Sequence, residues 1–106
     1  SSNATANFRI GKFSSGLSFD YAAGAALGTP ITPINAGIID NNGQLNWNKN
    51  ISIGTTSFAG GVKVLAIGNA TTVPNVAPTG GGILYVENGA LKYRGPTSPP
   101  VTLAPA

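Results

Sequence analysis

The sequence contains no cysteine, no histidine and no methionine. Without cysteine and histidine the chain lacks the usual zinc ligands, the thiolate nucleophile and the side chain that most often moves protons near neutral pH. Its carboxylate side chains are Asp20, Asp40 and Glu87, so a paired-acid glycosidase would have to use two of these three. Asp40 lies beside a predicted turn and Glu87 directly before another, where a capping or solvated carboxylate is the ordinary role. We therefore expect a chain that is not an enzyme and that holds no metal and no cofactor.

Charged residues are scarce as well. Six basic and three acidic residues make up 8% of the 106 positions, against about 25% in an ordinary soluble domain. Apolar residues account for 42%, which is enough to build a core. An isolated domain normally stays soluble through a well-charged surface. The composition instead favours a subunit whose flanks are covered by neighbours, and we expect these partners to be copies of the same chain.

Two classes of partner are disfavoured. No run of 20 apolar residues is present, so no membrane insertion is predicted. The net charge of +3 does not indicate nucleic-acid binding, because the basic residues are spread along the chain with no two adjacent, whereas such binding needs them on one face. The first residues resemble neither a signal peptide nor an initiating methionine. We expect the chain to be a mature form or an excised fragment of an extracellular protein.

Fifteen glycines and eight prolines divide the chain into short pieces whose apolar residues alternate with period two, which is typical of β-strands. The clearest alternation runs over residues 44–53. One face of this segment is mainly asparagine, and the other is apolar apart from Lys49, with Leu45, Trp47, Ile51 and Ile53. The pattern predicts one strand with a buried face in an antiparallel sheet. It places Trp47 in the core, rather than in a sugar-stacking position.

Residues 83–94 carry a strong hairpin signal. Asn88 and Gly89 favour a type I′ turn, since both central residues of that turn need positive φ. Closing the turn there brings apolar pairs together on one face, which are Leu84 with Tyr93 and Val86 with Leu91. Tyr85 and Lys92 then pair on the opposite, polar face. We expect this second face to be exposed and these two side chains to be candidate surface contacts.

The same reasoning predicts strands at 7–13, 17–21, 36–40, 61–67 and 101–103, with turns at 14–16 and 41–43. Residues 22–35 and 69–82 are expected to be irregular. About eight short strands at regular spacing predict a single all-β domain over 1–106, an antiparallel β-sandwich or jelly-roll-like domain. Neighbouring subunits would complete it, with 1–13 and 96–106 as candidate exchanged or interface arms.

Three sequons begin at Asn3, Asn50 and Asn69 and are candidate glycosylation sites. About two are expected from the content of asparagine, serine and threonine alone. The sequons therefore do not by themselves indicate modification.

Residues 62–106 contain, in this order, a glycine run at 80–82, the hairpin at 83–94 and a short Thr-containing strand near an alanine-rich end. This order resembles the carboxy-terminal region of tail fibres, tail spikes and related appendage proteins of tailed bacteriophages. The tail after Pro96 is richer in proline than the family pattern, which leaves the pairing of the last strand open. The resemblance implies a protein on the virion surface, often a homotrimer, and carries over no catalytic residue.

From these observations we expect a structural subunit of an extracellular assembly, a phage tail-fibre or appendage protein that forms a homotrimer or a helical fibre through β interfaces. Two alternatives stay open. One is a subunit of a pilus-like surface filament that polymerises by strand donation. The other is a small carbohydrate-binding module, for which the ligand would be a host-surface glycan.

Overall fold

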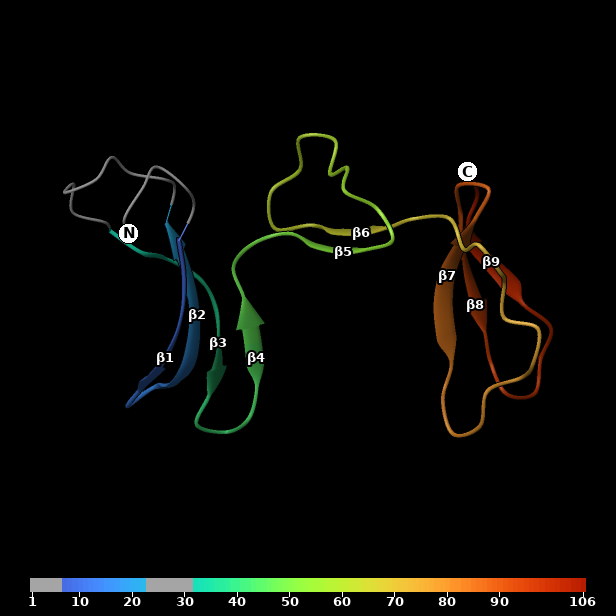
Figure 1. Ribbon diagram of the computed structural model, residues 1–106. Coiled ribbons are helices and arrows are strands. Elements are labelled where there is room, and N and C mark those ends of the chain that lie inside the picture. Colours follow the sequence, from blue (N-terminus) through green and yellow to red (C-terminus); the bar gives the residue numbers. More distant parts are fainter. Residues whose placement is uncertain (1–6, 23–31) are drawn as a thin grey trace. The chain divides into compact units, whose positions relative to one another are not determined.

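The computed structural model describes residues 7–22 and 32–106, and over these ranges it contains nine strands and no helix (Figure 1). The predicted all-β class is confirmed. No helix that could cross a membrane is found in this part of the chain. The strands are β1 Asn7–Phe13, β2 Gly16–Ala22, β3 Ile34–Asp40, β4 Leu45–Trp47, β5 Ile51–Ile53, β6 Leu65–Ile67, β7 Ile83–Glu87, β8 Ala90–Arg94 and β9 Val101–Ala104.

The chain divides into two compact units, Ser1–Asn50 and Ile51–Ala106, which differs from the single domain that the sequence suggested. The boundary falls inside the predicted strand 44–53, which is wrong as one strand, because it forms β4 and β5 in separate sheets. Residues 48–50 separate the two strands. The backbone N–H of Asn48 still donates a hydrogen bond to the Ala36 carbonyl of β3 at 2.7 Å, and Trp47 Nε1 donates one to the carbonyl of Asn50 at 3.2 Å.

The first unit holds one antiparallel sheet in the order β1-β2-β3-β4. The predicted strands 7–13 and 17–21 pair as a hairpin, with Phe13 opposite Gly16. The predicted turn at 41–43 is confirmed: Asp40 Oδ1 accepts hydrogen bonds from the amides of Asn42 and Gln44, both at 2.9 Å. Strand β3 begins at Ile34, two residues earlier than expected. Most of the predicted irregular segment 22–35 lies outside the described residues.

The second unit contains a parallel pair, β5-β6, and an antiparallel sheet in the order β7-β8-β9. The predicted strand 61–67 is correct only from Leu65 onward, because the preceding residues form a turn in which Lys63 has φ of 60°. The hairpin at 83–94 has the predicted register. Positive φ at Asn88 (49°) and Gly89 (83°) confirms the turn.

Both candidate arms pair within their own chain. Strand β1 pairs with β2 along its full length, and β9 pairs with β8. Residues 1–6 of the first arm lie outside the described part. Strands β1 and β9 are edges of their sheets, so they remain available for contact, while neither sheet needs a strand from another chain to form.

Few apolar side chains are buried. Among the described residues, the hydrophobic side chains classed as buried are Ala22 and Tyr85, which are 4% and 7% exposed, while sixteen large hydrophobic side chains are exposed. The described residues of the first unit form a single sheet, and none of them forms the second layer of a sandwich. The sandwich or jelly-roll arrangement stays a prediction.

Candidate functional site

The sheet of the first unit has one apolar face. Residues directly opposite in neighbouring strands point to the same side of a sheet, and the register places Ile10, Phe19, Gly37 and Trp47 in one row across the four strands. Rows on either side complete what we call the apolar face: Phe8, Ile10, Leu17, Phe19, Tyr21, Ile34, Ile39, Leu45 and Trp47, with Lys12 opposite Leu17 as a charged member of the same row. Three of these side chains are largely exposed, with exposed fractions of 82% for Phe8, 68% for Ile10 and 62% for Leu45.

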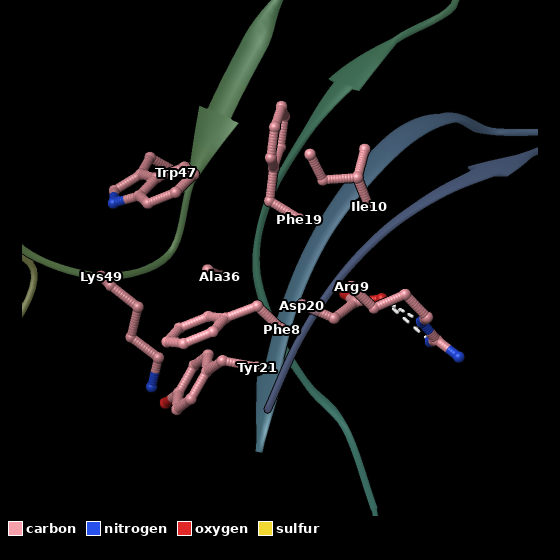
Figure 2. A pocket seen from close by; sticks show the side chains of 9 residues that line it. All are labelled: Phe8, Arg9, Ile10, Phe19, Asp20, Tyr21, Ala36, Trp47 and Lys49. Carbon is pink, nitrogen blue, oxygen red and sulfur yellow. Dashed lines mark hydrogen bonds and ion pairs between the residues drawn. The ribbon is translucent and has the colours of Figure 1, made fainter. Parts of the chain in front are cut away.

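The apolar face is hollowed beside Trp47. The hollow has a volume of about 390 Å³, and aromatic rings from three strands line it. The rings of Phe19 and Trp47 lie 6.2 Å apart between centroids at an angle of 59°. Lys49 Nζ lies 5.5 Å from the centre of the Tyr21 ring, a cation–π contact at the rim. The lining residues are Phe8, Arg9, Ile10, Phe19, Asp20, Tyr21, Ala36, Trp47 and Lys49 (Figure 2).

The opposite face of the sheet carries a polar cluster centred on Asp20, which is 8% exposed. Its carboxylate accepts hydrogen bonds from Asn35 Nδ2, Arg9 Nη2 and Ser18 Oγ, each at 2.9 Å. The Asn35 bond, followed by those from Arg9 and Ser18, lowers the pKa of Asp20 below its ordinary value of 3.8. Asn48 Nδ2 donates to Asn35 Oδ1 at 3.0 Å. The cluster thus connects β1, β2, β3 and the segment after β4, and it holds the strands that carry the apolar face.

The remaining carboxylates also have partners. Asp40 caps the turn after β3. Glu87 Oε1 lies 2.7 Å from Lys92 Nζ, and this hydrogen bond raises the pKa of Lys92. In the described part of the chain no three histidine, cysteine or acidic residues gather where they could hold a metal ion. That the chain is not an enzyme and takes no cofactor stays a prediction.

The predicted exposure of Tyr85 is wrong. It was expected to be an exposed contact, but it is 7% exposed, whereas Leu84 and Tyr93 on the face expected to be buried are 57% and 37% exposed. The register was right and the choice of covered face was wrong. Lys92 is half-buried and bonded to Glu87, so Tyr85 and Lys92 lie opposite each other as predicted but do not form an exposed site.

The candidate glycosylation sites differ in their surroundings. Asn3 lies outside the described residues. Asn50 is half-buried at the end of the first unit, and its carbonyl accepts the Trp47 bond. Asn69 is exposed, but its Oδ1 accepts a hydrogen bond from the Gly89 amide at 2.8 Å, which connects it to the hairpin turn. Modification of these residues stays a prediction.

The aromatic residues Phe8, Phe19 and Tyr21 were not singled out from the sequence. Their signal was present, because they alternate with polar residues in the predicted strands 7–13 and 17–21. Reading the two strands together as one hairpin face would have found them.

Comparison of the chain with protein-family models, with curated proteins and with solved structures gives no significant match.

Proposed function

We propose that the chain is a structural subunit of an extracellular assembly, a bacteriophage tail fibre or related appendage, and that its copies associate through β-sheet surfaces. One observation carries the proposal. Among the described residues, sixteen large hydrophobic side chains are exposed and two hydrophobic side chains are buried. Monomeric soluble proteins rarely leave large contiguous apolar patches in water, and such patches mark interaction sites.

The assignment to a phage appendage has a narrower basis. It follows from the resemblance of residues 62–106, whose hairpin and last strand form β7, β8 and β9. This layout is compatible with the family pattern. The expected location on the virion surface and the choice between homotrimer and helical fibre depend on that resemblance.

The alternatives have less support. A filament that polymerises by strand donation needs a sheet with a missing strand, whereas β1 and β9 already pair within their own chain. A carbohydrate-binding module needs polar groups around its rings to recognise hydroxyls. Three lining residues of the hollow are charged. Two of them, Arg9 and Asp20, belong to the polar cluster of the opposite face and bind each other at 2.9 Å. The third, Lys49, lies over Tyr21.

Analytical ultracentrifugation of the full chain tests the proposal. From about 1 to 100 µM we expect a mass above that of one chain that rises with concentration. Added salt should leave this association intact or strengthen it, because apolar contacts are not screened whereas ion pairs are. A closed species of fixed size would support a fibre tip, and open-ended growth would support a filament. A monodisperse monomer over the whole range would contradict the proposed function.

A further inference from the structure

We propose that the turn between β7 and β8 is a site of spontaneous covalent modification, at which Asn88 is converted to aspartate or isoaspartate, and that the side chain of Asn69 protects this site in the folded chain. The inference goes beyond the proposed function. It concerns the chemical lifetime of the second unit, whatever the chain assembles with.

The reaction uses the backbone nitrogen of Gly89 as its nucleophile. This nitrogen loses its proton to the solvent and forms a bond to the side-chain carbonyl carbon of Asn88. The bond from that carbon to the amide nitrogen breaks, ammonia leaves with a proton regained from the solvent, and a five-membered succinimide remains. Water then opens the ring at either carbonyl, which produces aspartate or isoaspartate. Glycine favours the attack because it has no side chain to hinder its nitrogen, and asparagine is among the thermolabile residues of proteins.

In the folded chain a specific hydrogen bond holds this nucleophile. The last pair of the β7–β8 ladder is Glu87 with Ala90, so the two turn residues lie outside the ladder. The N–H of Gly89 donates instead to Asn69 Oδ1 at 2.8 Å. A hydrogen bond from an N–H favours the protonated nitrogen. The contact therefore opposes the first step of the reaction.

The backbone positions the protecting side chain. Asn69 forms a parallel bridge with Val86 of β7, and the Ala70 N–H donates to the Val86 carbonyl at 2.7 Å. These contacts hold Asn69 alongside the strand that leads into the turn. Protection of the turn thus depends on a segment about twenty residues away in the sequence, and a local opening of that segment exposes the nucleophile.

Modification at this position weakens the hairpin. Asn88 and Gly89 are exposed, so water reaches the site. Aspartate adds a negative charge next to Glu87, which is bonded to Lys92. Isoaspartate adds a carbon atom to the main chain of the turn, and a two-residue turn that sets the register of both strands does not accommodate it.

The chain contains an internal reference for this reaction. Asn42 and Gly43 have the same order in the turn after β3. There the Gly43 N–H donates to the Asp40 carbonyl at 3.0 Å, so its environment does not depend on Asn69. Conversion at Asn42 can be measured in the same sample.

Incubation of the full chain at mildly alkaline pH tests the inference, with peptide mass spectrometry and enzymatic isoaspartate detection as the readouts. Asn69→Ala should raise the rate of conversion at Asn88 by at least about fivefold, because one net hydrogen bond changes an opening equilibrium by about this factor. The rate at Asn42 should not change. Asn69→Asp keeps an oxygen acceptor and should restore slow conversion at Asn88.

Ile83→Ala is the matched control. It weakens the same hairpin at its other end, where the half-buried Ile83 pairs with Arg94, and leaves the acceptor in place. If this variant accelerates conversion at Asn88 as much as Asn69→Ala does, protection comes from folding in general and the inference is overturned. Equal rates at Asn88 in the wild type and in Asn69→Ala overturn it as well.

Hydrogen exchange of the wild type decides the question if Asn69→Ala does not fold. The Gly89 amide should exchange more slowly than in an unstructured peptide, because its N–H is bonded to Asn69. Exchange as fast as in that peptide would show that Asn69 does not hold the nitrogen.

Discussion

The indole of Trp47 in β4 covers the bare Cα of Gly37, its register partner in β3. A methyl group at Gly37 would collide with the indole ring and approach the carbonyl oxygen of Asn46 to 2.7 Å. The absence of a side chain at this one position therefore lets the tryptophan lie over the sheet and form one wall of the hollow.

Gly37→Ala should accordingly destabilise the first unit. Overpacking of this kind costs about 1–3 kcal/mol, and the displaced indole should also change its fluorescence. Urea unfolding followed by Trp47 emission and by circular dichroism measures both effects. Gly81→Ala is the control, because a methyl group there meets nothing within 4 Å. Equal unfolding midpoints for the two variants would contradict the close contact between Gly37 and Trp47.

The elements that local patterns encode were predicted well. Alternation located β1 and β2, and Asn88-Gly89 fixed the register of β7 and β8, because the turn and its strands are adjacent in sequence. The break after Trp47 was missed, although the polar run 48–50, in which Lys49 occupies an apolar position of the alternation, marked it. The apolar residues before and after residues 48–50 keep the same period-two alternation, so the alternation alone does not reveal that the strand ends between them.

Features that depend on distant segments were not predictable in the same way. The polar cluster needs Arg9, Asp20 and Asn35 from three strands, and the last two meet only because β2 and β3 shift register between Phe19 and Asp20. Likewise, the side of the hairpin that is covered depends on other segments such as residues 69–70, which bond to Val86. No local pattern in 83–94 contains that information.

The burial of Tyr85 gives a prediction for the second unit. Tyr85→Ala removes a large buried side chain and should cost about 3 kcal/mol. Tyr93→Ala is a matched control on the neighbouring strand, where the same truncation affects a side chain that is 37% exposed and should cost clearly less. Differential scanning calorimetry compares the two variants. A larger loss for Tyr93→Ala would restore the original assignment of the faces.

The hairpin turn is open to a separate test. Gly89 has a φ of 83°, which β-branched residues resist, so Gly89→Val should cost about 1 kcal/mol or more. Asn88→Gly keeps a residue that accepts positive φ and should change the melting temperature little. If Gly89→Val melted like the wild type, the turn would have to lie at other residues in solution.

Asp20 gives the first unit a pH-dependent stability. Because Asn35, Arg9 and Ser18 all donate to its carboxylate, the folded state favours the charged form and lowers its pKa below 3.8. The stabilisation is fully present above that ordinary value, and it is lost as the pH falls through the lower pKa of the folded state. The urea midpoint followed by Trp47 emission should therefore stay level down to about pH 5 and fall in more acidic solution. Asp20→Asn should have a lower midpoint at neutral pH and a flatter acid profile. An acid fall of wild-type size in that variant would show that Asp20 is not its source.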